Sequence, residues 1–204
     1  MKHEKIEFLF KTSAGITITF GGYSDSAADK TINEGSLLTF STSATDADIP
    51  ANTLTFSLVG APSGASINSS TGVFTWTPTE AQGPAIYSFT VRASDGSLSA
   101  DQTVNVTVNE VNIAPVLSTI TDKSINEGSQ LTFTADATDA DIPANTLSYS
   151  LIGAPAGATI NSATGAFSWT PTEDQGPATY NFNVRVSDGS LTSDQPVNVT
   201  VSEV

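Results

Sequence analysis

The sequence predicts an all-β protein built from two tandem antiparallel Greek-key β-sandwiches, cadherin-like or immunoglobulin-like, with no significant helix. Three observations predict this fold: a long internal repeat, short runs in which apolar and polar residues alternate, and turn-forming residues between the runs. Alternation with a period of two is typical of strands that bury one face. About seven such strands in about 90 residues are typical of a β-sandwich.

The internal repeat defines the domains. Residues 29–111 align without a gap onto the C-terminal part of the chain at an offset of 93, and the segment ATDADIPANTL occurs in both copies, at 44–54 and 137–147. A repeat of this length is a whole small domain rather than one unit of a solenoid. We therefore predict a first sandwich at 29–111, a second at 112–204, and a separate N-terminal segment at 1–28.

The N-terminal segment has its own alternating pattern. Apolar residues alternate with polar ones over 6–10 and again over 16–20, on either side of residues 11–15, which predicts a β-hairpin. The apolar stretch at 6–10 is too short for the core of a signal peptide. Two interpretations remain open: a remnant of a preceding domain, or a dedicated anchor or assembly strand.

Within each repeat, the strands and the aromatic residues follow a regular order. In the first copy the alternating runs lie at 54–58, 87–91 and 104–108. Turn-forming residues lie between and beside these runs, at 62–64, 70–72, 83–84 and 95–96. Trp76 and Trp169 occupy one fixed place among apolar neighbours, so we predict core residues rather than exposed platforms for a sugar ring. Tyr87 and Tyr180 open a strand and are expected to form the tyrosine corner of such sandwiches.

Composition excludes several classes of function. The chain has 21 acidic and 7 basic residues, a net charge of −14, which repels nucleic acid and anionic membranes and attracts cations. It has no cysteine for disulfides or thiolate metal sites, and no apolar run long enough for membrane insertion. The only histidine is His3, so neither sandwich offers a Ser-His-Asp triad or a histidine-ligated metal. We predict that the protein is not an enzyme.

Acidic residues gather in loops that carry no lysine or arginine. Carboxylates held close together repel one another unless a cation intervenes, and calcium takes six to eight oxygen ligands in irregular geometry. These loops therefore predict calcium binding, with plain solvated surface as the alternative. The residues, with their second-copy counterparts in brackets, are Asp46 and Asp48 (Asp139 and Asp141), Glu34 (Glu127), Glu80 with Gln82 (Glu173 with Gln175), and Asp95 (Asp188), joined by Glu110 and Asn112 of the linker.

Four stretches carry a family resemblance, in the order ATDADIPANTLTFSL, TGVFTWTPTE, YSFTVRASDGSLS and VTVNEVNIAPV. They resemble the cadherin-like members of the immunoglobulin-type sandwiches, in particular the tandem cadherin-like (dystroglycan-type) and immunoglobulin-type repeat domains of bacterial surface proteins. The resemblance covers all of the chain except the N-terminal segment. In that family calcium lies between consecutive domains.

Carried over position by position, the resemblance implies one weak Ca²⁺ site at the interdomain junction. Its ligands would be Glu34, Glu80, Gln82, Glu110, Asn112, Asp139, Asp141, Asp188 and the backbone carbonyl of Asn145. Three departures from the family pattern weaken it: Ile113 stands where a second linker Asp is expected, Gln82 is neutral where Glu is usual, and Glu110 replaces Asp. We expect the weak end of the extracellular range, about 10⁻⁴–10⁻³ M.

These observations favour a pair of non-enzymatic extracellular or cell-surface modules for adhesion, or a spacer rigidified by calcium, with other surface domains or proteins as partners. Three alternatives remain. The chain could decorate a phage capsid or tail as a virion protein anchored by its N-terminal hairpin. It could be a carbohydrate-binding module for a polysaccharide. It could also assemble with itself head to tail into a filament, by pairing the acidic loops at its two ends.

Overall fold

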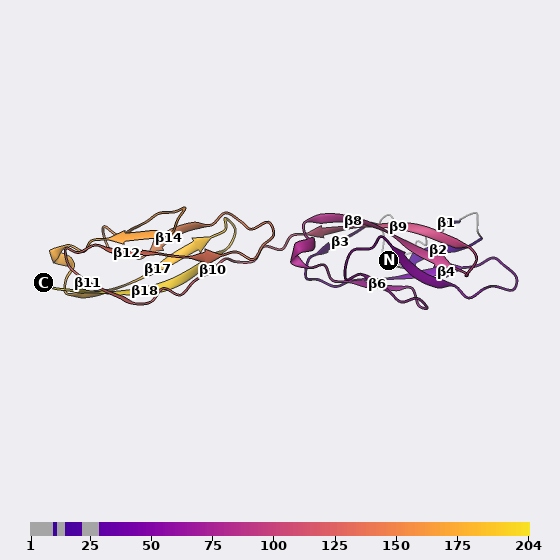
Figure 1. Ribbon diagram of the computed structural model, residues 1–204, viewed down its shortest axis with the longest axis horizontal. Coiled ribbons are helices and arrows are strands. Elements are labelled where there is room, and N and C mark those ends of the chain that lie inside the picture. Colours follow the sequence, from indigo (N-terminus) through magenta and orange to yellow (C-terminus); the bar gives the residue numbers. More distant parts are fainter. Residues whose placement is uncertain (1–9, 12–14, 22–28) are drawn as a thin grey trace, which may run out of the picture. The chain divides into compact units, whose positions relative to one another are not determined.

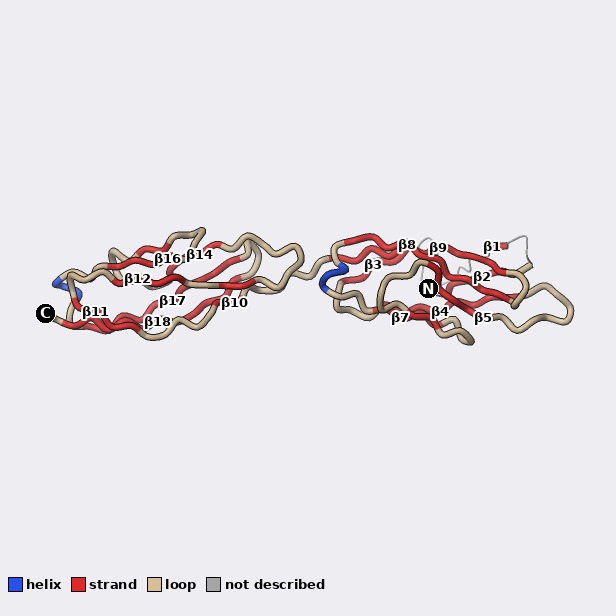
Figure 2. Tube along the Cα trace, in the orientation of Figure 1, coloured by secondary structure: helices blue, strands red, loops and turns tan. Residues whose placement is uncertain are grey.

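The computed structural model describes residues 10–11, 15–21 and 29–204, and the chain divides into two compact units, Met1–Val111 and Asn112–Val204. Strands and loops make up nearly all of the described chain (Figure 1). The helical pieces in this part are two short 3₁₀ turns, η1 (Glu80–Gln82) and η2 (Glu173–Gln175), drawn in blue in Figure 2. The predicted all-β fold is confirmed.

Unit 1 is a sandwich of a five-stranded and a four-stranded sheet. The first sheet has the order β1 (Phe10–Lys11), β2 (Thr17–Gly21), β4 (Leu38–Thr45), β7 (Val73–Trp76) and β6 (Ser66–Ile67), and the second has the order β3 (Asp29–Asn33), β9 (Ser99–Asn109), β8 (Ala85–Ser94) and β5 (Thr55–Val59). The pairings are antiparallel except for β3 with β9, which run parallel.

Unit 2 repeats this plan, except that the counterpart of the five-stranded sheet is divided into a three-stranded sheet and a two-stranded pair. Its strands are β12 (Leu131–Thr134), β16 (Ala166–Trp169) and β15 (Thr159–Ile160) in one sheet, the pair β10 (Val116–Leu117) and β13 (Ala137–Thr138), and β11 (Lys123–Asn126), β18 (Thr192–Ser202), β17 (Ala178–Ser187) and β14 (Ser148–Ile152) in the four-stranded sheet. Here β11 and β18 form the parallel pair.

A stack of three phenylalanine rings crosses each sandwich from one sheet to the other. In unit 1 the centroids of Phe40 and Phe74 are 4.5 Å apart, and those of Phe74 and Phe89 are 5.2 Å apart. Unit 2 has the same stack at the repeated positions. Aromatic residues bury large areas, so these stacks, together with the valines of the long strands, form the core of each unit.

Both tryptophans are core residues, as predicted, with 1% of their surface exposed. The indole N–H of Trp76 donates to the carbonyl of Ser63 at 3.2 Å, and the ring packs edge-on against Tyr87. The hydroxyl of Tyr87 donates to the carbonyl of Gln82, which confirms the tyrosine corner. Every one of these contacts recurs in unit 2.

Part of the N-terminal segment belongs to the first sandwich, whereas the repeat predicts a boundary at residue 29. A hairpin forms between β1 and β2 as expected, and β2 then pairs with β4. Ile16, Ile18 and Phe20 lie in the core of unit 1 rather than on a separate anchor. The physical reason is that three apolar side chains on one face of a strand complete this sandwich. The expected strand at 6–9 lies outside the described residues.

Strand register shows how the two units differ at their first strand. Thr17 pairs with Thr45 in unit 1, and Val116 pairs with Thr138 in unit 2. The offset of the repeat would have placed Tyr23 opposite Thr45, so unit 1 uses a strand that begins six residues earlier.

Among the described residues, the structure has no helix long and apolar enough to cross a membrane.

Candidate functional site

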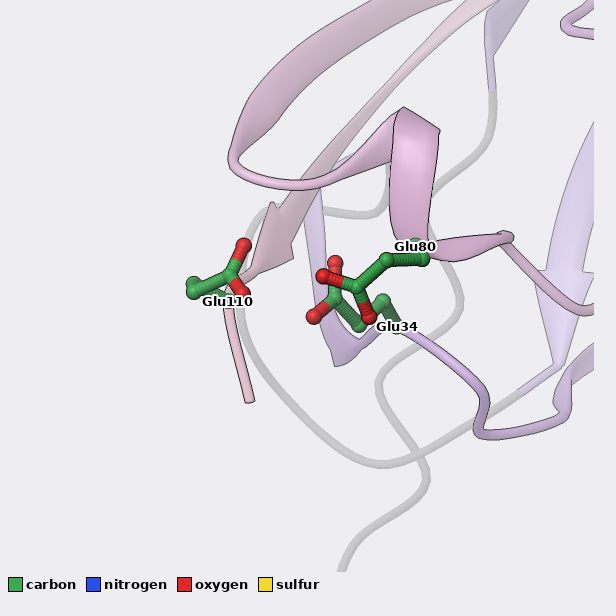
Figure 3. Close-up of side chains that lie close together, drawn as sticks. All are labelled: Glu34, Glu80 and Glu110. Atoms are coloured by element: carbon green, nitrogen blue, oxygen red, sulfur yellow. The ribbon is translucent and has the colours of Figure 1, made fainter. Parts of the chain in front are cut away.

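Three glutamates from separate elements meet at the end of unit 1 where β9 finishes. Glu34 follows β3, Glu80 lies in η1 and Glu110 follows β9 (Figure 3). Each offers a carboxylate oxygen within 4.8 Å of the other two. We call this set the Glu34 cluster. Its three carboxylates can neutralise a divalent cation.

Local pairing and capping bring the Glu34 cluster together. The parallel pairing of β3 with β9 places Asn33 opposite Asn109, so the residues that follow, Glu34 and Glu110, leave the sheet side by side. The turn η1 closes as a capping box between Thr79 and Gln82. Such a box satisfies backbone donors at the start of a helical turn and holds Glu80 in the first turn.

Glu34 is buried, with 6% of its surface exposed. Its Oε1 accepts the backbone N–H of Val111 at 2.9 Å, whereas its Oε2 is buried and has no hydrogen-bond partner. Burying a charged oxygen without a partner is costly. A cation at this oxygen would remove that cost.

Gln82, the neutral residue in the predicted ligand set, is occupied elsewhere. Its Oε1 accepts the N–H of Thr79 at 2.9 Å, and its Nε2 donates to the carbonyl of Ser63 at 3.2 Å. Its backbone oxygen accepts the hydroxyl of Tyr87. Gln82 therefore shapes the turn that carries Glu80, and ligation by its amide would require these bonds to break.

Three aspartates form a second cluster within unit 2. Asp139, Asp141 and Asp188 each offer a carboxylate oxygen within 4.8 Å of the others, and we call this set the Asp141 cluster. The backbone N–H of Asp141 donates to Oδ1 of Asp139 at 3.0 Å, so the two acids share a tight loop. Oδ2 of Asp139 is buried and has no hydrogen-bond partner. This cluster also has an unsatisfied acceptor that a cation could use.

The residues that lead into unit 2 close the Asp141 cluster. Asn112 Nδ2 donates to Oδ2 of Asp188 at 2.8 Å, and Asn112 Oδ1 accepts Nδ2 of Asn145 at 3.0 Å. The backbone N–H of Ile113 donates to Oδ1 of Asp141 at 2.9 Å, and Asn145 donates to Oδ2 of the same carboxylate. As a result, Asp141 is only 3% exposed.

Two of these contacts are ones that the sequence does not suggest. The resemblance predicts calcium ligation by the backbone carbonyl of Asn145, and in the structure its side-chain amide also donates to Asn112 and Asp141. Ile113 lacks the carboxylate expected there, yet its backbone N–H binds Asp141. Every residue except proline has a backbone N–H, so the identity of residue 113 does not predict its hydrogen bond to Asp141.

Hydrogen bonding keeps Asp188 ionised. The backbone N–H of Leu191 lowers the pKa of Asp188 most, and the side chain of Asn112 lowers it further. Donors directed at a carboxylate stabilise its charged form. Asp188 therefore carries a full negative charge at neutral pH.

The acidic residues of the predicted ligand set thus fall into two groups, one in each unit, and Gln82 lies in the turn that carries Glu80. A third group, Asp46, Asp48 and Asp95, repeats the aspartate arrangement in unit 1. In unit 2 Glu127 repeats Glu34: it is 8% exposed, accepts the backbone N–H of Val204, and has no hydrogen-bond partner at Oε2. Ion pairs among the described residues involve other acids, Asp101 and Asp194.

Comparison with known proteins identifies both units. The profile of the family described as "Putative Ig domain" matches residues 21–109 and 114–202. A stretch of Chitinase A from Pseudoalteromonas piscicida is 38% identical over 107 residues. That match covers 51% of this chain and 13% of the chitinase, so the chain spans a small part of that relative.

Solved structures of cadherin repeats have the same fold. Human protocadherin-24 EC1-2 (form II) is 19% identical with a TM-score of 0.53, and the match covers 87% of this chain and 95% of that one. Drosophila N-cadherin EC1-4 is 18% identical with a TM-score of 0.57, covering 86% of this chain and 47% of that one. At such identities the likeness describes the fold alone.

Proposed function

The chain belongs to the Putative Ig domain family, and from this premise we propose that its two sandwiches are non-catalytic extracellular modules, serving adhesion or spacing, whose linker is restrained by calcium. The observation that carries the proposal is Glu34: its buried Oε2 has no hydrogen-bond partner, and its carboxylate lies within 4.8 Å of those of Glu80 and Glu110. Extracellular modules of this kind work where calcium is abundant.

The donor set supports calcium over other metals. All the cluster side chains offer oxygen, and the chain has no cysteine. Oxygen-only sites suit calcium, magnesium and manganese, whereas zinc and copper prefer nitrogen or sulfur. Calcium accepts irregular arrangements of carboxylates, and magnesium demands an octahedron and retains water. The net charge of −14 adds long-range attraction for a cation.

The covalent chain connects the two clusters. Glu110 belongs to the Glu34 cluster and Asn112 contacts the Asp141 cluster, with only Val111 between them. Consecutive Cα atoms are about 3.8 Å apart, so such a linker is short. Ions held at both clusters would fix the backbone on both sides of Val111 and reduce the freedom of the linker.

Calorimetric titration of the whole chain with calcium tests the proposal. We expect a dissociation constant of about 10⁻⁴–10⁻³ M. Glu34→Gln should abolish the heat from the Glu34 cluster. Asp122→Asn is the matched control, because it removes the same charge at an exposed site, where the carboxylate accepts Nδ2 of Asn198. A wild-type protein without calcium heat, or equal losses in both variants, would contradict the proposal.

A second candidate function comes from the relative named Chitinase A: an accessory module beside a polysaccharide-degrading enzyme. A module of this kind could act as a spacer or bind the polysaccharide itself. Both tryptophans are buried, and no aromatic side chain whose burial the structure describes is exposed. A platform for stacking sugar rings is therefore lacking in this part of the chain, which favours the spacer. Titration with chitin fragments should leave tryptophan fluorescence unchanged, and a saturable change would support direct binding.

A further inference from the structure

Two glycines in equivalent positions do not need to be glycine for their backbone conformation. Gly83 has φ −111° and ψ 157°, and Gly176 has φ −119° and ψ 155°, which is extended backbone that any residue adopts. The other glycines whose surroundings the structure describes, Gly15, Gly35, Gly60, Gly64, Gly72, Gly96, Gly128, Gly153, Gly157, Gly165 and Gly189, all have positive φ. The backbone conformation therefore does not require glycine at positions 83 and 176, and the space around each residue must explain why a side chain is absent.

The space beside each of these glycines is filled by a buried glutamate. A Cβ built at Gly83 would overlap Oε2 of Glu34, and it would lie 3.1 Å from the Cδ of Glu34 and 3.3 Å from Cγ1 of Val108. A Cβ at Gly176 would overlap Oε2 of Glu127 in the same way. The oxygen against each glycine is the one that has no hydrogen-bond partner.

We propose that Gly83 is a positioning residue of the Glu34 cluster: the missing side chain leaves the notch in which the free carboxylate oxygen of Glu34 is held for a cation. Gly176 does the same for Glu127. This inference rests on the proposed function for its calcium part, and on the packing alone for its steric part. It assigns a role to a residue with no ligand atom in its side chain.

The two oxygens of the Glu34 carboxylate are held by different contacts, and the notch at Gly83 provides one of them. Oε1 accepts the N–H of Val111, and Oε2 lies against Gly83, so the carboxylate is held at both ends. Cγ1 of Val108 is also only 3.3 Å from the Cβ position, so a methyl group at residue 83 would be crowded by Val108 and would collide with the carboxylate. Glu34 would then move, weakening its bond to Val111 and changing the oxygen offered to a cation.

Site-resolved calcium titration by NMR on the full chain tests the proposal. The amides of Val111, Leu98 and Leu191 donate to Glu34, Asp95 and Asp188, so each reports on a different cluster. Gly83→Ala should raise the dissociation constant at Val111 by about 10–100-fold, as for other residues that orient metal ligands. The values at Leu98 and Leu191 should not change.

Two further variants separate positioning from general damage to the turn. Gly176→Ala makes the same change before the equivalent proline of unit 2, Pro177. It should leave the dissociation constant at Val111 unchanged. Glu34→Asp shortens the side chain by one methylene, so in the Gly83→Ala background it makes room for the methyl group. We expect the two changes at residues 34 and 83 to be less than additive in calcium affinity.

Amide exchange without calcium decides the steric part independently. Gly83→Ala should speed hydrogen exchange at Val111, because the displaced carboxylate no longer accepts that N–H. A wild type that shows no shifts up to about 10 mM calcium, well above the affinity expected of a weak site, would refute the proposed function but leave this exchange measurement valid. Wild-type affinity in Gly83→Ala, or unchanged exchange at Val111, would overturn the positioning role.

Discussion

The same eleven residues, ATDADIPANTL, lie in different surroundings in the two units. In unit 2 Asn112 and Ile113 close the loop, and Asp141 is buried. In unit 1 Asp48 is exposed, and Asp46 accepts hydrogen bonds from the backbone N–H groups of Asp48 and Asn52 in its own loop. Identical sequence thus gives different burial. The comparison shows that the lead-in residues bury the Asp141 cluster, whereas the aspartates gather in both units.

The opposite ends of the two units are alike. Glu34 and Glu127 are both buried, and each accepts the N–H of the second residue after the last long strand. Each also lies against a glycine of ordinary φ. The buried glutamate is therefore an intrinsic part of the repeated fold, whereas the enclosed aspartate cluster depends on what precedes the repeat.

The largest expected effect tests whether the two cores are equivalent. Trp76→Ala and Trp169→Ala should each destabilise their own unit by about 3–5 kcal/mol, because each removes a large buried ring. Urea unfolding of the full chain, followed by NMR signals from each unit, measures both. A loss below about 1 kcal/mol in either unit would contradict the shared core, since buried large-to-small changes cost more.

The second effect tests the difference at the first strand. Ile18→Ala should cost unit 1 about 2–5 kcal/mol, because Ile18 is buried between Ile16 and Phe20. Leu117, which occupies the same register position in unit 2, is the matched comparison. If Ile18→Ala leaves the unfolding of unit 1 unchanged, β2 is not part of the sandwich core.

How far the sequence predicts the fold depends on whether the pattern is local. The strands, the core tryptophans and the tyrosine corner follow from alternation and from a fixed place in the repeat, so they could be predicted. The start of unit 1 could not, because the ungapped repeat pointed to residues after Phe20. Three apolar residues at 16–20 complete the core instead.

The candidate site could be predicted by residue type but not by contact. Acidic residues without basic neighbours predicted one set of ligands at the junction, and the structure gathers these acids in two clusters, one in each unit. The use of Gln82 in a capping box and the backbone donor at Ile113 depend on side-chain direction and chain path. Composition and spacing do not encode these, and the notch at Gly83 is visible only once Glu34 is in place.

The third effect tests the closing of the aspartate loop. Asn112→Ala removes one donor to Asp188 and one acceptor from Asn145, which should cost unit 2 about 1–2 kcal/mol. It should also speed hydrogen exchange in the loop at 139–145 while leaving the loop at 46–52 unaffected. If the loop at 139–145 exchanges at the same rate in Asn112→Ala as in the wild type, Asn112 does not close that loop.

The smallest effect concerns the exposed ion pairs, which the two units share. Arg92 binds Asp101 through two hydrogen bonds, and Arg185 binds Asp194 likewise. Both pairs are well exposed and screened by solvent, so Arg92→Ala and Arg185→Ala should each destabilise their unit less than any of the changes above.

The pH dependence of that small effect has a definite sign. The hydrogen bond from Arg92 lowers the pKa of Asp101 below its usual value. The stabilisation is therefore complete above the unfolded pKa of about 3.9 and is lost as the pH falls through the lower folded pKa. The difference between wild type and Arg92→Ala should be constant near neutrality and vanish in strong acid. A difference that grows on acidification would contradict this pairing.

The central claim is that calcium restrains the linker, and small-angle X-ray scattering with and without a chelator tests it most directly. At a dissociation constant near 10⁻⁴ M, 1–10 mM calcium would favour the bound state by about 1.4–2.7 kcal/mol. We expect the spread of interdomain distances to narrow with calcium in the wild type and in Asp46→Asn/Asp48→Asn, but not in Asp139→Asn/Asp141→Asn. Scattering that is identical with and without calcium in the wild type would show that the acidic clusters do not control the linker.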